Sequence, residues 1–324
     1  MKSFSVLAIT LLAMWLASTP AMSVAATAPN GLKASYQPSK LTENVYVIHG
    51  PVSFPTPQNQ GFRNNPGIVI TSKGVVIIDP GSSVHIGSMV VGQVRRLTNK
   101  PVVAVINTHV HGDHWLGNDG IKRAFPKAVI YSHPKMKSLI ADGAGEDWIK
   151  ILNDRTNSAI SGTRPVGPDK TVTQGDIIKI GDTRFRILHS GPAHTDNDIM
   201  IHVVDQGVLF TGDIVRNGLI GRAQKSTTGS IEALDLALKT NAQIFVPGHG
   251  KAGTRQIVDR YRVLMVSLLD TIKKNYDEGL ESHQIKPILT KLLDPYKNWV
   301  GFKTNLGYLT STIYLEVEGE AFKE

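Results

Sequence analysis

The chain of 324 residues contains no cysteine. This absence excludes disulfide bonds, thiolate metal ligands, iron–sulfur clusters and a cysteine nucleophile. Long hydrophobic runs are also missing: the longest apolar stretch, residues 6–17, has about a dozen residues, whereas a membrane-spanning helix needs about 20. A metal site in this chain would therefore have no thiolate ligand.

The chain also lacks a run of five like charges, although its formal net charge is +8 and its pI is near 9.5. A basic balance can indicate a nucleic acid or an acidic surface as partner. Because the basic clusters, such as residues 122–127, are short and interrupted, a scattered basic surface is the simpler interpretation. At about 150 residues per domain, the length fits one large domain or two modest ones.

The first 25 residues have the pattern of an export signal. Lys2 gives a positive start, residues 6–17 are apolar, and Pro20 precedes the small residues 23–25 (Ser-Val-Ala), which fit the cleavage rule. We therefore predict a signal peptide over residues 1–25 and a periplasmic or secreted protein with no stable membrane anchor after cleavage. The alternatives are a retained anchor or a buried N-terminal helix. Export also argues against a nucleic-acid partner.

Between the expected linker and residue 250, the chain falls into two segments in which the same kinds of element follow one another in the same order. Residues 26–40 are polar and predict a linker. In each segment a hairpin ends in an aspartate (Asp79, Asp213), a helix follows, and a buried strand runs into a loop with a histidine (His109, His249). This order predicts two similar sheets packed together, with helices outside. The expected strands are 44–49, 67–71, 74–79, 101–108, 128–132, 177–180, 184–189, 199–204, 208–211 and 242–246, and the expected helices are 86–97 and 231–238.

Residues 251–324 have a different character. Residues 256–276 predict a long amphipathic helix with Tyr261 on its apolar stripe. Two further helices are expected over 284–293 and 306–317. The chain therefore ends in a helical extension.

Metal-ligating side chains concentrate directly after the buried strand at 101–108. His109, His111, Asp113 and His114 stand within six positions, in the run Thr-His-Val-His-Gly-Asp-His. Imidazole nitrogen together with carboxylate oxygen suits zinc. Alternate residues of an extended loop point the same way, so His109 and His111 can hold one ion while Asp113 and His114 turn toward a second.

Three further candidates lie at strand ends of the second segment. They are His194 in Gly-Pro-Ala-His-Thr, Asp213 in Phe-Thr-Gly-Asp and His249 in Pro-Gly-His-Gly. We expect each on a tight turn with glycine, where the backbone can approach closely and a side chain can be aimed. With the four residues of the first loop they make seven candidate ligands.

These motifs resemble those of the metallo-β-lactamase superfamily. The match comprises, in order, His-x-His-x-Asp-His at 109–114, Ala-His-Thr at 193–195, Thr-Gly-Asp at 211–213 and Gly-His-Gly at 248–250. The resemblance implies an α/β (α+β) fold, a four-layer αββα sandwich over residues 41–250, followed by the C-terminal helical extension over residues 251–324. Asp79, in Ile-Asp-Pro-Gly, looks like the structural aspartate that the family places beside its site.

The resemblance also implies two zinc ions per chain, with iron as the alternative metal. The implied ligands are His109, His111 and His194 for the first ion, Asp113, His114 and His249 for the second, and Asp213 as a bridge between both. A metal-bridging hydroxide would attack a carbonyl, and the second zinc would stabilise the leaving anion. Asp113 would also act catalytically by orienting the nucleophile.

The function implied is that of an exported di-zinc hydrolase acting on an ester, thioester, lactone or lactam of a small molecule. Many true β-lactamases carry Cys or Ser where this chain has Asp213, and a bridging Asp is the pattern of glyoxalase II-like thioesterases, lactonases and arylsulfatases. With Asn65-Pro66-Gly67 before the first hairpin, the chain looks most like exported hydrolases linked to sulfur-oxidation and quinoprotein systems. The alternatives are an iron-dependent persulfide dioxygenase of this fold, a metallo-β-lactamase proper, a nucleic-acid-processing member or a degenerate binding protein.

Several other polar residues carry weaker expectations. The long loop 51–66, with Phe54, Phe62 and Arg63, is expected to overhang the metals, as a substrate flap or as an ordinary surface loop. Arg216 and Asn217 follow Asp213 and are candidates for substrate contact. The histidines expected to lie on the surface or at strand edges, without a role as ligands, are His49, His85, His133, His202 and His283; His189 is weighed as a neighbour of the site.

Overall fold

The computed structural model describes residue 1, residue 32, residues 36–222 and residues 224–322. The expected signal peptide and most of the expected linker lie outside the described residues. In the part of the chain that is described, no helix is long and apolar enough to cross a membrane.

The first sheet has seven strands that lie side by side in chain order. They are β1 (Ser39–Lys40), β2 (Val45–Val47), β3 (Gly67–Thr71), β4 (Gly74–Ile78), β5 (Val102–Ile106), β6 (Val129–Ser132) and β7 (Lys170–Thr171). β3 and β4 form the expected hairpin, and β4, β5 and β6 pair in parallel. Every residue of β4 is buried, as befits a strand covered on both faces. β1 pairs with β2, so the sheet begins within residues 26–40.

The second sheet has five strands, in the order β12-β11-β10-β9-β8. They are β8 (Ile177–Ile180), β9 (Thr183–Leu188), β10 (Met200–Val203), β11 (Val208–Arg216) and β12 (Ile244–His249). β10 and β11 form the expected hairpin, whereas β11 and β12 run parallel. The prediction that the strand at 208 ends at Thr211 is wrong. Register shifts at Gly212 allow β11 to continue as far as Arg216, which pairs with His249.

The described helices are α1 (Val84–Leu97), α2 (Gly112–Trp115), α3 (Asn118–Ala124), α4 (Pro134–Leu139), α5 (Gly145–Thr156), α6 (Thr227–Leu238), α7 (Arg255–Asp277), α8 (Ser282–Leu292) and α9 (Phe302–Ala321). Ser83 caps α1 and Ser226 caps α6, each accepting a hydrogen bond from a backbone N–H of the first turn. A kinked segment, Ile140–Ala144, in which Gly143 has φ +101°, joins α4 to α5, and short 3₁₀ turns occupy Val204–Gln206 and Asp294–Tyr296.

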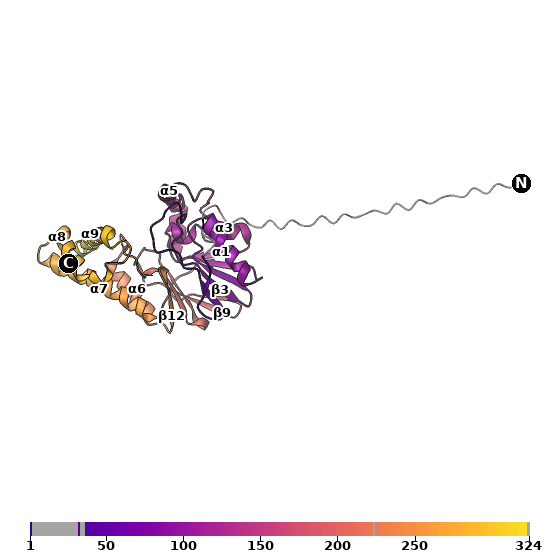
Figure 1. Cartoon of the computed structure of the whole chain (residues 1–324). Coiled ribbons are helices and arrows are strands. Elements are labelled where there is room, and N and C mark those ends of the chain that lie inside the picture. Colours follow the sequence, from indigo (N-terminus) through magenta and orange to yellow (C-terminus); the bar gives the residue numbers. More distant parts are fainter. Residues whose placement is uncertain (2–31, 33–35, 223, 323–324) are drawn as a thin grey trace.

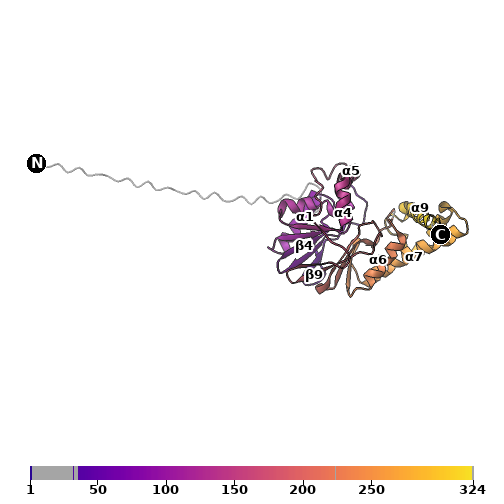
Figure 2. The same cartoon turned by 180° about the vertical axis from the view of Figure 1, so that it is seen from behind.

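The elements form four layers, with helix, sheet, sheet and helix in succession (Figure 1). Alternate residues of β4 show why: Val76 and Ile78 pack between the sheets, whereas Val75 and Ile77 pack under α1 and α3. The second sheet presents Phe210 inward and Leu209 outward, toward α6 and α7. The expected αββα sandwich is therefore confirmed, and the view from behind shows the same order (Figure 2).

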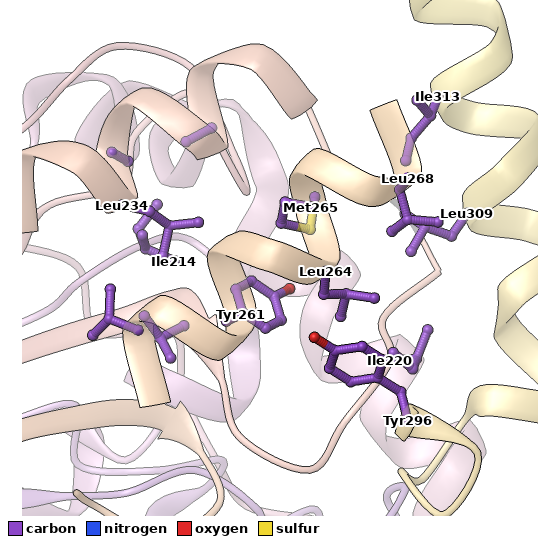
Figure 3. Close-up of a cluster of buried hydrophobic side chains, with 14 of the residues drawn as sticks. Ile214, Ile220, Leu234, Tyr261, Leu264, Met265, Leu268, Tyr296, Leu309 and Ile313 are labelled. Carbon is purple, nitrogen blue, oxygen red and sulfur yellow. The ribbon is translucent and has the colours of Figure 1, made fainter. Parts of the chain in front are cut away.

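The C-terminal helices pack against the outer layer of the second sheet. The side chains of Tyr261, Leu264 and Leu268 on α7 form one buried stripe between Ile214 of β11 and Leu309 of α9 (Figure 3). Backbone hydrogen bonds also join the extension to the segment after β11: Ile220 N–H donates to Val300 O at 2.9 Å, and Val300 N–H donates to Gly218 O at 3.0 Å. The extension is thus part of the wall beside the strand ends that carry the candidate ligands.

Candidate metal centre

The seven candidate ligands come from the ends of strands in both sheets. The loop after β5 and the short helix α2 carry His109, His111, Asp113 and His114. The second sheet supplies the others: His194 precedes β10, Asp213 stands in β11, and His249 is the last residue of β12. All are buried except His111, which is half-buried.

The structure brings these side chains together in two groups. His109, His111, His194 and Asp213 form one group, and Asp113, His114 and His249 form the other; the ligand atoms within each group lie within 4.8 Å of one another. Each group contains residues from both sheets. The donor sets, three histidines with a carboxylate and two histidines with a carboxylate, are those that bind zinc and similar divalent ions.

Asp213 stands between the two groups. Its Oδ1 atom lies 3.3 Å from His114 Nε2 and 3.2 Å from His249 Nε2, whereas its Oδ2 atom lies 3.5 Å from His194 Nε2. One oxygen of the carboxylate thus faces each group. The carboxylate is therefore within reach of both groups.

The expectation that Asp213 lies on a turn after its strand is corrected by the structure, which places it inside β11. Gly212, with φ +51°, supplies the left-handed step that turns the strand. A Cβ at Gly248 in the neighbouring strand would collide with the Asp213 carboxylate. Glycine at both positions therefore lets the carboxylate lie flat between the strands.

Hydrogen bonds fix the ring orientation of two histidines through Asp79. Its carboxylate accepts from the Thr108 hydroxyl at 2.6 Å and from His114 Nδ1 at 2.8 Å. Because a carboxylate only accepts, the Thr108 hydroxyl donates to it and must accept from His109 Nδ1, 2.9 Å away. Both rings thus carry hydrogen on Nδ1 and leave Nε2 free as a lone-pair donor. The Nε2 atom of His109 is buried without a hydrogen-bond partner.

Two more rings are held in the same way. His194 Nδ1 lies 2.9 Å from Gln224 Oε1, and His249 Nδ1 lies 2.8 Å from the backbone oxygen of Arg63. His194 Nε2 then meets His111 Nδ1 at 2.9 Å. Histidines that bind metals almost always donate their other ring N–H to such a partner. The cluster therefore fits divalent metal ions by its internal hydrogen bonding as well as by its composition.

Burial and charge set the protonation of the cluster. Burial, reinforced by neighbouring histidines, lowers the pKa of His109 and His194 well below the usual value. Burial also lowers the pKa of His111 to about 4, although the carboxylates of Asp113 and Asp213 oppose it. Burial would also lower the pKa of His114, but the carboxylates of Asp79, Asp213 and Asp113 outweigh it and raise that pKa. His109, His111 and His194 are therefore neutral, the form that binds a metal ion, whereas His114 would release its Nε2 proton to an ion that binds there.

The pKa values of the two carboxylates in the cluster are also lowered, which favours their charged form. Burial alone would raise the pKa of Asp213, but His249 and His114 outweigh it and hold the pKa well below its usual value. The pKa of Asp113 is lowered against its burial by His114, Arg63 and His249. Both side chains are thus ionised at neutral pH, and a buried anionic cluster of this kind is stabilised by cations.

A cavity of about 480 Å³ opens beside the two groups. Phe54, Pro55 and Arg63 of the 51–66 loop line it, as expected for a loop that overhangs the site. Phe62 does not, because its ring is fully buried in the core under α1. The volume suits a small organic molecule.

Of the two candidates for substrate contact that follow Asp213, only Arg216 lines the cavity. Arg216 lines the cavity but is buried, and its Nε and Nη2 atoms donate to the Tyr261 hydroxyl at 3.0 and 2.7 Å. Asn217 instead donates to the backbone oxygen of Lys251. The sequence reasoning missed Gln224 and Asn305, which approach the site from distant segments and belong to no recognisable motif.

The remaining histidines of the described chain lie outside both groups. The rings of His133 and His189 stack on each other with centroids 4.3 Å apart, and His189 Nδ1 contacts the backbone oxygen of Asp198. His49 Nε2 accepts from the backbone of Ala252. His202 is buried in β10, facing away from the metal centre.

Comparison with known proteins agrees with this architecture. The model of the family described as the metallo-beta-lactamase superfamily matches residues 60–249, more than half of the chain. A metallo-beta-lactamase type 2 of Bacillus sp. (strain 170) is 26% identical over 227 residues, which cover 68% of this chain and 78% of that protein. A hydroxyacylglutathione hydrolase of Francisella tularensis subsp. holarctica (strain LVS) is 24% identical over 181 residues, covering 56% of this chain and 59% of the relative.

An acyl-coenzyme A thioesterase MBLAC2 of Gallus gallus is 30% identical over 128 residues, which cover 37% of this chain and 43% of the relative. For most of these relatives, the match spans less than two thirds of their own length.

Two solved structures share the fold. A metallo-beta-lactamase from Pontibacter korlensis superposes with a TM-score of 0.53 at 20% identity, covering 71% of this chain and 98% of that one. The stereoselective inverting sec-alkylsulfatase Pisa1 from Pseudomonas sp. superposes with a TM-score of 0.63 at 15% identity, covering 88% of this chain and 50% of that one. Residues 251–324 are more than a fifth of the chain, so the second match includes part of the C-terminal helices.

Proposed function

The chain belongs to the metallo-beta-lactamase superfamily, and from this membership and the geometry of the centre we propose that it is a di-zinc hydrolase of small molecules. The observation that carries the proposal is the position of Asp213, with one carboxylate oxygen facing each group of ligands. The histidine hydrogen bonds support it, because they turn a ring lone pair toward the place of each ion.

In this proposal each ion has its own set of ligands. His109, His111 and His194 hold the first ion; Asp113, His114 and His249 hold the second; Asp213 contributes to both. A bound zinc pair supplies a nucleophile derived from water at neutral pH and stabilises the negative charge that develops on the substrate. Iron is the alternative metal, because histidine and carboxylate ligands accept it as well.

Asp113 has a second task in the proposal. Its Oδ2 lies 3.5 Å from His249 Nε2 and 3.8 Å from Arg63 Nη1, at the wall of the cavity. Because the pKa of Asp113 is lowered, its carboxylate is ionised at neutral pH and can accept a hydrogen bond from the attacking water. That contact would fix the direction of attack on a substrate in the cavity.

We propose esters, thioesters, lactones and lactams as the substrate classes. Support comes from relatives that are a β-lactamase, a thioesterase and hydroxyacylglutathione hydrolases. We also propose that the protein is exported to the periplasm or secreted, on the evidence of residues 1–25. A small-molecule substrate, with no nucleic acid and no stable membrane anchor after cleavage, completes the proposal.

The test is the metal content of the mature protein, purified without added metal, measured beside hydrolysis of nitrocefin, a thioester, a lactone and an aryl ester. We expect about two zinc ions per chain, as the two groups imply, and turnover of one ester-like class. His109→Ala should lose the first ion and the activity, whereas the control His133→Ala should keep both. Full activity in His109→Ala contradicts the proposal, as does one iron per chain with oxygen uptake on a persulfide and no hydrolysis.

A further inference from the structure

Four arginines line the cavity beside the metal centre. They are Arg63, Arg155, Arg216 and Arg222. The only carboxylates among its described lining residues are Asp113 and Asp213, both within the metal centre. Outside the metal centre, every charged side chain of the wall is therefore an arginine.

Two of the four arginines are already engaged. Arg216 is buried and donates to the Tyr261 hydroxyl. Arg63 lies against Asp113, with Nη1 3.8 Å from the carboxylate. Arg155 and Arg222 are exposed, and neither forms an ion pair with any residue in the described part of the chain.

Arg222 is held in place although it is exposed. Its Nε donates to Asn305 Oδ1 at 3.3 Å, and its guanidinium carbon lies 5.1 Å from the centre of the Tyr308 ring. Asn305 is itself buried and donates through Nδ2 to the backbone oxygen of Ile220 at 2.8 Å. Two partners from α9 thus fix the inner part of the guanidinium, and no hydrogen bond to the described residues occupies its Nη atoms.

Apolar side chains complete the cavity. Phe54 and Trp148 contribute aromatic rings, the Trp148 ring lying 4.8 Å from that of His111. Leu152 and Leu219 add aliphatic surface. A ligand that matches these walls has an apolar body together with a negative charge.

Building on the proposed hydrolase function, we propose that Arg222, positioned by Asn305 and Tyr308, binds an anionic group of the substrate away from the bond that is cleaved. The substrate is then an amphipathic organic anion that carries a carboxylate or sulfate group, and Arg155 adds a second positive charge at the same cavity. A fixed guanidinium donates two parallel hydrogen bonds to such a group at little cost in side-chain entropy.

The kinetic test compares two esters that differ in one group: the 4-nitrophenyl monoester of adipic acid, which carries a terminal carboxylate, and 4-nitrophenyl hexanoate, which does not. Arg222→Gln should raise KM for the anionic ester about tenfold, with kcat little changed and the neutral ester affected less than about twofold. Tyr308→Leu, at an exposed position, should give a smaller effect of the same kind.

The matched control is Arg260→Gln. Arg260 is also an exposed arginine that stacks on aromatic rings, Tyr296 and Trp299, but it does not line the cavity. This variant should leave both esters unaffected. Equal loss on the two esters in Arg222→Gln, or an undiminished preference for the anionic ester, overturns the proposal.

Calorimetry separates this inference from the hydrolase proposal. The probes are 4-phenylbutyrate, 3-phenylpropyl sulfate and neutral 4-phenylbutyramide, titrated into the zinc-loaded and the metal-free protein. We expect the anions alone to bind, about tenfold more weakly in Arg222→Gln, in both forms of the protein; the stronger of the two anions identifies the group. Binding that depends on Arg222 without any hydrolysis would overturn the hydrolase and keep the anion site, whereas hydrolysis with equal binding of all three probes would do the reverse.

Discussion

The hydrogen bonds of Asp79 make a single isosteric substitution informative. In the unmodified protein the Thr108 backbone N–H donates to Asp79 Oδ1 at 2.8 Å. The amide oxygen of Asp79→Asn can still accept this hydrogen bond. The amide nitrogen then replaces the oxygen that accepts from Thr108 and His114, and it donates to both. Asn tolerates the left-handed backbone of this position, where φ is +49°. The variant should therefore keep the fold.

The reversed hydrogen bonds change two metal ligands together. His114 must accept at Nδ1 and so carries its hydrogen on Nε2, the atom that faces Asp213. The Thr108 hydroxyl, now an acceptor from the amide, donates to His109 Nδ1 and moves the hydrogen of that ring to Nε2 as well. One ligand of each group is thus blocked by a proton.

The magnitude follows from the number of blocked ligands. Loss of a partner that orients a metal ligand typically costs 10- to 100-fold in metal affinity, or about 1.4 to 2.7 kcal/mol for each ion. We expect Asp79→Asn to weaken both ions by this amount. Thr108→Val removes the hydroxyl that joins Asp79 to His109 but keeps the hydrogen bond between Asp79 and His114, so it should weaken the first ion and leave the second near its original affinity.

Zinc affinity can be measured by competition with a chromophoric chelator, for the two variants and for the unmodified protein. Unfolding of the metal-free proteins provides the control for stability. If Asp79→Asn binds both ions as tightly as the unmodified protein, or if Thr108→Val weakens both ions equally, the assignment of ring hydrogens through Asp79 is wrong.

Two predictions concern stability away from the centre. The Glu316 carboxylate of α9 accepts from the Thr227 backbone N–H at 2.7 and 2.8 Å and so caps α6; Glu316→Ala should lower the free energy of unfolding by about 1 to 2 kcal/mol in urea denaturation, with Glu316→Gln in between. Burial would raise the pKa of Asp119, but hydrogen bonds from Arg123 and Arg164 outweigh it and lower that pKa. The stability that this carboxylate contributes is therefore present above its unfolded pKa of about 3.9 and lost as pH falls through the lower folded value. Asp119→Asn should be less stable than the unmodified protein at pH 7, and the difference should shrink below about pH 4; a difference independent of pH would contradict this.

The architecture and the members of the candidate centre could be predicted because both depend on local patterns. The uninterrupted apolar runs of β4 and β5 mark buried strands. The ligands follow such strands directly, as His109 follows β5, and the ends of neighbouring strands meet at one edge of a sandwich. The spacing of His109, His111, Asp113 and His114 therefore also constrained their positions in space.

The side chains that hold those ligands could not be predicted in the same way. Gln224 reaches His194 from 30 residues away, and Arg63 reaches His249 through its backbone oxygen, which no residue type encodes. The true end of β11 at Arg216 depends on pairing with β12, which the local sequence around Gly212 does not contain. Each of these features requires knowledge of which distant segments meet.

Both groups of ligands draw on both sheets, and this has a consequence for how the halves of the chain stay together. All strands of the first sheet come from residues 39–171, and all strands of the second come from residues 177–249. His111 and His194, 83 positions apart in the chain, meet only when the two sheets are in contact. The two halves pack through a shared core but are linked covalently by only one short connection, residues 172–176, so an ion held by either group would act as a second link between them. In a chain without cysteine, such ions would restrict the unfolded ensemble in the way that disulfides do elsewhere.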